Sequence, residues 1–133
     1  MIELPKKFKE EMKELLGEEY PVYLATYDQP VRQGLRFNSR KLTKEKWEAM
    51  DPFGSQPVPW TKNGYFVEEG KGEEKGGGPT EHRCYYAGLY YIQEPSAMTP
   101  ASRLPVEPGD RVLDLCAAPG GKATELGCRL SGK

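Results

Sequence analysis

The residues best suited to chemistry lie between positions 112 and 124, where the chain reads VLDLCAAPGGKAT. A short apolar run, residues 112–115, is followed by Pro119-Gly120-Gly121 and then by residues that favour a helix. This order predicts a strand, a tight glycine-rich turn and a helix. Such a turn exposes backbone N–H groups at a helix N-terminus. Gly120 and Gly121 let a ligand approach the backbone closely, because no Cβ stands in the way.

Two phosphate-binding patterns do not fit this turn. A P-loop requires a glycine five residues before Gly121 and a Ser or Thr after the lysine, but those positions hold Cys116 and Ala123. The dinucleotide pattern G-x-G-x-x-G fails as well, because Cys116 and Ala118 stand where glycine is needed. What remains is an acidic residue followed by small residues at every second position, namely Asp114, Cys116, Ala118 and Gly120.

This remaining pattern resembles the first motif of Rossmann-like methyltransferases that use S-adenosylmethionine. The longer string DLCAAPGGK, residues 114–122, is more specific. It resembles the Sun/nucleolar-protein family of RNA (cytosine-5)-methyltransferases, nearest to the bacterial ribosomal small-subunit type. The string YYIQEPSAM, residues 90–98, is similar to the segment just upstream of that family's cofactor turn. The resemblance runs from about Leu4 to the end of the chain and is strongest over residues 86–122.

The resemblance implies that the turn binds S-adenosylmethionine. Asp114 would support the turn by accepting backbone N–H bonds, and Lys122 would reach the cofactor's carboxylate or a nearby acid. The expected cofactor-binding residues are Cys116, Ala117, Ala118, Pro119, Gly120, Gly121 and Lys122.

The catalytic residues are expected outside this chain. In the family a cysteine thiolate attacks C6 of cytosine, so that C5 becomes enamine-like and takes the methyl group, and a second cysteine helps release the product. The resemblance places both downstream of Lys133. Cys116 falls inside the cofactor turn, and Cys84 and Cys128 have no motif support. A Rossmann-like site also needs an acidic residue on a second strand, roughly 20 residues past the glycines. We therefore expect the N-terminal portion of a longer enzyme, inactive by itself.

A local group of basic residues precedes this region. Lys and Arg side chains are commonly just solvated surface, but a cluster of them also suits contacts with phosphates. The resembled family carries a similar Arg-x-Asn strand before its catalytic domain, and Arg36 and Asn38 match that pattern. The RNA-binding residues expected here, with ribosomal RNA as the partner that the resemblance implies, are Arg36, Asn38, Arg40 and Lys41.

The rest of the chain predicts the elements that must position these sites. Hydrophobic spacing and turn signals predict helices and strands, and the charged, glycine-rich stretch 68–81 predicts a mobile loop. The expected helices cover residues 4–16, 44–50, 95–102 and the stretch after 121, and the expected strands cover 34–38, 57–60, 65–67, 90–92 and 112–115.

The expected fold class is α/β. Residues 1–85 would form an N-terminal helix and a small α+β unit that faces RNA. Residues 86–133 would form the first strand, turn and helix of a truncated Rossmann-like methyltransferase domain.

Composition limits the other function classes. The chain has 133 residues, a formal net charge of −1 and a pI of about 5.9, so any RNA-binding surface must be local. No apolar run approaches the roughly 20 residues that span a bilayer, and the N-terminus lacks the apolar core of a signal peptide. Three widely spaced cysteines predict neither disulfides nor a metal site, which indicates a cytoplasmic protein.

Two alternatives stay open at this point. The chain could be a non-catalytic RNA-binding module with a vestigial cofactor turn. It could also belong to a methyltransferase that acts on a protein or a small molecule. The sequence does not determine the oligomeric state.

Overall fold

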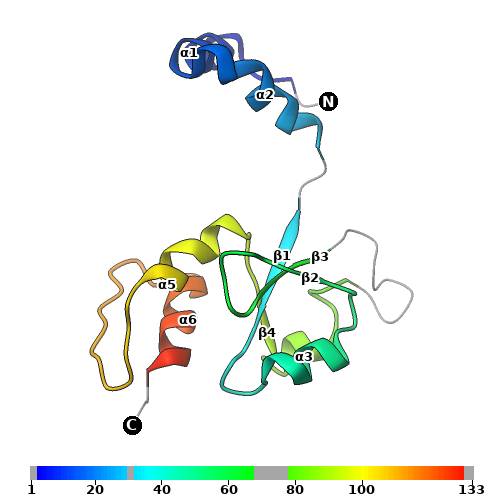
Figure 1. Cartoon of the computed structure of the whole chain (residues 1–133), viewed down its shortest axis with the longest axis vertical. Coiled ribbons are helices and arrows are strands. Elements are labelled where there is room, and N and C mark those ends of the chain that lie inside the picture. The colour runs from blue at the N-terminus through cyan, green and yellow to red at the C-terminus, as the bar shows by residue number, and fades with distance from the viewer. Residues whose placement is uncertain (1–2, 30–31, 68–77, 131–133) are drawn as a thin grey trace. The chain divides into compact units, whose positions relative to one another are not determined.

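The computed structural model describes residues 3–29, 32–67 and 78–130. Its contacts divide the chain into two compact units, residues 1–31 and 32–133 (Figure 1). The first unit is helical, with α1 (Lys6–Leu16) and α2 (Tyr20–Ala25). Pro5 caps the start of α1, and Gly17, with φ of 53°, ends it. The helix predicted over residues 4–16 is therefore confirmed.

The second unit contains a four-stranded antiparallel sheet in the order β2-β3-β1-β4. In β1, Leu35 faces Tyr65 of β3 on one side and Ile92 of β4 on the other. The strands predicted at 34–38, 65–67 and 90–92 are confirmed. The strand bounds are β1 (Gln33–Phe37), β2 (Gln56–Pro57), β3 (Gly64–Val67) and β4 (Tyr90–Ile92).

In its described residues the second unit contains four α-helices. Thr43 caps the first of them, since its hydroxyl accepts a hydrogen bond from the Lys46 amide at 3.3 Å. The predicted helix after Pro95 is confirmed as a 3-10 turn, Ser96–Met98, that leads into an α-helix. The helix bounds are α3 (Lys44–Met50), α4 (Arg83–Tyr86), α5 (Thr99–Arg103) and α6 (Gly121–Arg129).

The sheet buries a different kind of surface on each face. Because side chains alternate along a strand, Leu35 and Phe37 of β1 share one face, and Arg36 lies on the other. On the first face Phe37 stacks on Trp47 of α3, with ring centroids 6.2 Å apart, inside an aromatic core. On the second face Arg36 contacts Glu125 of α6. Helices α3 and α6 therefore pack against opposite faces of the sheet.

Two strand predictions differ from the structure. The strand predicted over 57–60 overlaps β2 only at Pro57, and residues 59–60 form a turn. The strand predicted over 112–115 is not formed. Residues 112–115 are irregular, and Leu113 and Leu115 are 81% and 85% exposed. A strand is defined by its hydrogen-bonded neighbours, and no described segment pairs with these residues. An apolar run alone therefore predicted the strand wrongly for this chain. Residues 68–77 of the predicted mobile loop lie outside the described residues.

The predicted division into two domains between residues 85 and 86 stays a prediction. Strand pairing crosses this position in the structure. Strand β4, which follows residue 86, pairs with β1, which precedes it. In the described segments we find no helix with the length and apolarity needed to cross a membrane.

Candidate cofactor site and RNA-facing residues

A cavity of about 420 Å³ lies between the end of β4 and the turn before α6. This volume is within the range of about 300–1,000 Å³ that is typical of small-molecule sites. One wall comes from β4 and the residues after it, and the other comes from all seven predicted cofactor-binding residues. The lining residues are Tyr91, Ile92, Gln93, Glu94, Ala97, Asp114 and residues 116–122.

The turn itself has the conformation that its sequence predicts. The Asp114 carboxylate accepts a hydrogen bond from the Cys116 amide at 3.1 Å, so its predicted supporting role is confirmed. Gly120 has φ of 108°, a left-handed conformation that favours glycine, and it is the N-cap of α6. The first N–H groups of a helix have no hydrogen-bond partner within the helix. The first residues of α6, Gly121 and Lys122, line this cavity, so their backbone N–H groups are donors available to a ligand.

Gly121 lets α6 approach β4 closely. A Cβ at this position would lie 3.0 Å from Gln93 Nε2 and 3.4 Å from Tyr91 Cε1. Gln93 is 9% exposed, and its Nε2 donates to the carbonyl of Ala97 at 3.0 Å. Among the described residues its buried Oε1 has no hydrogen-bond partner. A buried amide oxygen without a partner costs free energy. The Gln93 Oε1 atom is therefore an acceptor on this wall of the cavity that a hydrogen-bond donor of a ligand would satisfy.

Two carboxylates and one ammonium group line the cavity. Hydrogen bonds from the Ser96 hydroxyl and from the Ser96 and Ala97 amides hold the pKa of Glu94 below its usual range, so Glu94 is ionised at neutral pH. Asp114 adds a second acid, and exposed Lys122 lies in the first turn of α6. S-adenosylmethionine carries a sulfonium, an ammonium and a carboxylate, so these charges fit it.

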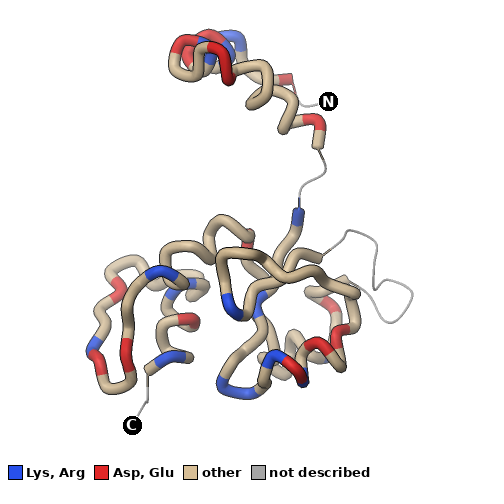
Figure 2. The backbone as a smooth tube through the Cα atoms, in the orientation of Figure 1, with Lys and Arg blue, Asp and Glu red and all other residues tan. Residues whose placement is uncertain are grey.

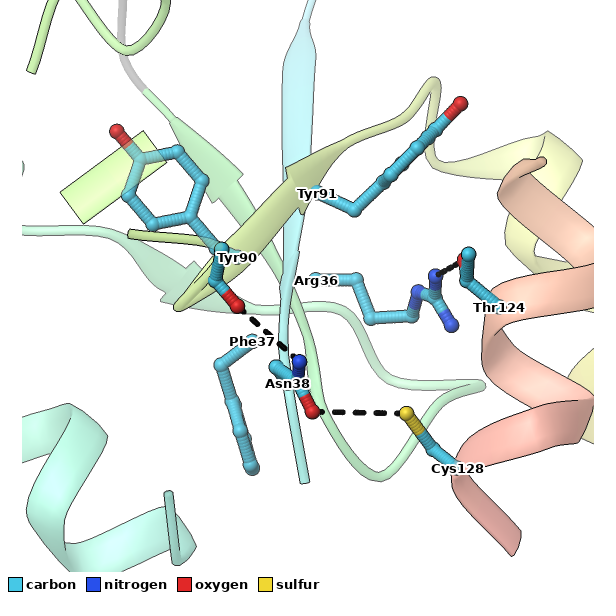
Figure 3. A pocket seen from close by; sticks show the side chains of 8 residues that line it. Arg36, Phe37, Asn38, Tyr90, Tyr91, Thr124 and Cys128 are labelled. Carbon is cyan, nitrogen blue, oxygen red and sulfur yellow. Dashed lines mark hydrogen bonds between the residues drawn. The ribbon is translucent and has the colours of Figure 1, made fainter. Parts of the chain in front are cut away.

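The predicted RNA-binding residues are held by contacts within the protein (Figure 3). Arg36 is 5% exposed, forms an ion pair with Glu125 and donates to the Thr124 hydroxyl at 2.9 Å. The Asn38 amide donates to the carbonyl of Gly88 at 3.1 Å, and its Oδ1 lies 3.6 Å from the sulfur of Cys128. These contacts surround a second, smaller cavity of about 180 Å³.

Arg40 and Lys41 follow β1 as a continuous basic stretch on the surface (Figure 2). Arg40 donates to the carbonyl of Leu130 at 3.1 Å, and Lys41 donates to the carbonyl of Ala87 at 2.7 Å. The Asn38 side chain also accepts from the Arg40 amide at 3.0 Å. Asn38 therefore shapes the turn that carries the two exposed cations.

The two predicted groups meet along α6. Its first turn lines the cavity of about 420 Å³, and its interior carries the partners of Arg36. Sequence reasoning gave no role to Glu125 or to Thr124, which stand 89 and 88 residues from Arg36. It also gave no role to Gln93, although its position at the end of a predicted strand was a usable signal. We find no group of three or more metal-ligating side chains in the described part of the chain.

Comparison with known families tests these expectations independently. The profile described as "N-terminal domain of 16S rRNA methyltransferase RsmF" matches residues 4–95. The chain belongs to this family. The matched region of the RsmF N-terminal domain ends at Pro95, so it contains the β4 wall of the cavity but not the glycine-rich turn.

Individual relatives cover more of the chain. Ribosomal RNA small subunit methyltransferase F of Pectobacterium carotovorum is 34% identical over 138 residues, which cover 98% of this chain and 28% of that protein. The Serratia proteamaculans protein of the same name is 36% identical over 109 residues, 78% of this chain and 22% of its own length. The chain thus spans about a quarter of the length of these relatives.

A solved structure has the same fold. The crystal structure of a methyltransferase homolog protein from Pyrococcus horikoshii is similar to this chain with a TM-score of 0.74 and 30% sequence identity. The match covers 94% of this chain and 40% of the other.

Proposed function

We propose that this chain is the N-terminal part of an enzyme that transfers a methyl group from S-adenosylmethionine to C5 of a cytosine in ribosomal RNA. Membership of the RsmF N-terminal domain family and the names of the relatives support an rRNA methyltransferase. The observation that carries the cofactor assignment is the cavity of about 420 Å³ lined by residues 116–122.

The proposed cofactor would lie on the turn that precedes α6. Cys116, Ala117, Ala118 and Pro119 would offer exposed backbone, and Gly120 and Gly121 would allow close approach. Lys122 would neutralise the carboxylate of the bound molecule, and the Glu94 and Asp114 carboxylates would complement its positive groups. When bound, S-adenosylmethionine supplies the methyl group.

The proposed RNA surface centres on the exposed cations Arg40 and Lys41, which suit phosphate contacts. Asn38 would act by shaping their turn, as its bond to the Arg40 amide indicates. Arg36 would support the same surface from beneath, because its guanidinium is bonded to α6.

We also propose that residues 86–133 begin a Rossmann-like methyltransferase domain, and that residues 1–85 form the part that faces RNA. Leu113 and Leu115 are exposed beside a groove lined by Pro100, Leu104 and Leu126. Such an apolar strip suits a strand that becomes buried when parallel neighbours pair with it.

No catalytic residue is proposed within the chain. Cys84 is 8% exposed in the aromatic core, and half-buried Cys128 lies against Asn38. Cys116 is exposed on the turn that would hold the cofactor. The attacking thiolate and the second cysteine would come from the remainder of the enzyme.

The proposal can be tested with methyl-labelled S-adenosylmethionine, 16S rRNA and small ribosomal subunits. The protein extended through the same reading frame should label the RNA, and nucleoside mass spectrometry should find 5-methylcytidine. This chain alone should transfer no label. Label on protein, on a small molecule or on another base would contradict the proposed substrate.

A further inference from the structure

A chain of hydrogen bonds connects the sheet to the turn before α6. Arg36 of β1 donates to the Thr124 hydroxyl at 2.9 Å, and that hydroxyl donates to the carbonyl of Gly120 at 2.7 Å. The Thr124 amide also donates to the Gly120 carbonyl, at 2.9 Å. Arg36 is therefore connected to the turn through one intervening side chain, and Figure 3 shows the first of these bonds, from Arg36 to Thr124.

A second side chain of the sheet holds the neighbouring residue of the turn. The Tyr91 hydroxyl donates to the carbonyl of Pro119 at 3.1 Å. Tyr91 of β4 is the register partner of Arg36 in β1, and the Arg36 guanidinium lies over its ring, 5.8 Å from the centroid. Two adjacent residues of the sheet thus hold two consecutive carbonyls of the turn.

Arg36 itself is firmly held. It pairs with the buried Glu125 carboxylate, which also accepts from Asn63 Nδ2 at 3.1 Å. The Asn63 amide also donates to the carbonyl of Phe37 at 3.1 Å, and Asn63 is 5% exposed. In the described part of the chain Arg36 Nε is buried without a hydrogen-bond partner, but both terminal nitrogens of the guanidinium have one, and these two bonds restrict the side chain. The guanidinium is therefore a fixed point from which the turn can be positioned.

Fixing these two carbonyls also fixes two amides. In a trans peptide the C=O of one residue and the N–H of the next point in opposite directions within one plane. The bonds to the Pro119 and Gly120 carbonyls therefore set the directions of the Gly120 and Gly121 N–H groups. These are the donors at the start of α6, where a bound ligand meets the backbone.

We infer that Arg36 is a positioning residue for the cofactor turn, acting through Thr124 on Gly120 and together with Tyr91 on Pro119. This inference rests on the proposed function, because it assumes that the turn holds S-adenosylmethionine. It gives the buried cation of the Arg-x-Asn strand a task distinct from contact with RNA. A turn that is already held in its binding conformation raises affinity, because less conformational entropy is lost when the ligand binds.

A double-mutant cycle tests the inference. Arg36→Lys keeps a cation for Glu125 but loses the planar fork that reaches Thr124 as well. Thr124→Val removes the hydroxyl at nearly constant shape, and Thr124→Ser restores it. Arg129→Lys is the matched control, because Arg129 holds the same helix through the carbonyls of Ala101 and Leu104, at 2.8 Å each, away from the turn.

The first measurement is the dissociation constant of S-adenosylmethionine, determined by calorimetry in the protein extended through the same reading frame. Loss of one hydrogen bond corresponds to a factor of about three to ten. Arg36→Lys and Thr124→Val should each weaken binding by that factor. The double variant should bind no more weakly than the single variant with the larger loss of affinity. Thr124→Ser should weaken binding by less than twofold. Unchanged affinity in both single variants, multiplied effects in the double variant, or an equal loss in Arg129→Lys would overturn the inference.

The second measurement separates this inference from the proposed function. Amide signals of Gly120 and Gly121 in the ¹⁵N-labelled chain report the turn without any cofactor. They should move in Arg36→Lys and stay in place in Arg129→Lys, at a temperature where both variants are folded by circular dichroism. If they stay in place in both, the inference is wrong even where the cofactor binds. If they move only in Arg36→Lys but no cofactor binds the unaltered protein, the cofactor assignment fails and the positioning contact stands.

Discussion

The guanidinium of Arg36 donates to the hydroxyl of Thr124 across 2.9 Å and 88 residues of sequence. This contact joins the antiparallel sheet of the RsmF N-terminal domain to the helix that follows the glycine-rich turn. The match to that family ends at Pro95, well before Thr124. The two walls of the proposed cofactor cavity are therefore linked through one residue inside the family match and one beyond it.

Removing the charge from Glu125 should destabilise the second unit strongly. Glu125→Gln leaves the Arg36 guanidinium buried without its counter-ion, and breaking a buried pair in this way costs about 3–5 kcal/mol. Urea denaturation followed by the fluorescence of Trp47 and Trp60 measures the free energy of unfolding.

Glu48→Gln is the matched control for that experiment. Glu48 pairs with Lys44 at 3.7 Å on the surface, and a glutamine can still accept from the Tyr65 hydroxyl. Exposed pairs contribute at most about 1 kcal/mol, so this variant should unfold close to the unaltered chain. Similar losses in both variants would show that the Arg36–Glu125 pair is no more than a surface contact.

Two glycines of α6 should respond to alanine in opposite ways. A Cβ at Gly121 meets Gln93 at 3.0 Å, whereas nothing lies within 4 Å of a Cβ at Gly127. Gly127→Ala should stabilise the chain by about 0.5–1 kcal/mol through helix propensity. Gly121→Ala should lower stability by about 1 kcal/mol, because a crowded contact must relax. Thermal and urea unfolding compare them, and equal stabilisation in both would contradict the close packing of α6 on β4.

Features of the fold and of the candidate site that depend on neighbouring residues could be predicted from the sequence, whereas those that depend on residues far apart in the chain could not. Local patterns predicted the helices at residues 4–16 and 44–50 and the Asp114 bond that supports the turn. The strand at residues 112–115 was predicted wrongly, because it needs neighbours that no described segment provides. The role of Arg36 could not be seen either, since a basic residue in a basic cluster is equally compatible with solvent, phosphate and a buried partner. Only the pairing of β1 with β4 and the packing of α6 decide among these.

Stability should fall in alkaline solution. Burial, followed by the hydrogen bond to Glu48, raises the pKa of Tyr65 to about 12 from its ordinary value of 10.0. A raised pKa in the folded state means that this contribution is complete below pH 10 and is lost as the pH rises toward 12. Urea midpoints at pH 8, 10 and 11 should therefore decrease in that order.

Tyr65→Phe is the comparison for this pH dependence. Phenylalanine cannot ionise, so the decrease between pH 10 and 11 should be smaller in this variant. Burial also raises the pKa of Tyr90, so part of the decrease should remain. An identical decrease in the variant and the unaltered chain would exclude Tyr65 as its source.

RNA binding should depend on the exposed cations after β1. Replacing Arg40 and Lys41 together by alanine should weaken binding to an rRNA fragment and reduce the slope of log K against log salt by about 1 to 2, as expected for the loss of two phosphate contacts. Filter binding or fluorescence anisotropy at several salt concentrations gives this slope. The matched control replaces exposed Lys62 and Arg111, which carry the same charges outside the proposed surface. An equal change in both pairs would indicate a general charge effect and contradict a local RNA site.

We propose above that the turn at residues 116–122 holds S-adenosylmethionine. Calorimetric titration of S-adenosylmethionine into the protein extended through the same reading frame, beside its Gly121→Trp variant, tests it most directly. Circular dichroism and thermal unfolding check that the variant is folded. We predict binding at one site in the unaltered protein and none in the variant. Absence of binding to the unaltered protein, or equal binding to a folded variant, would contradict this proposal.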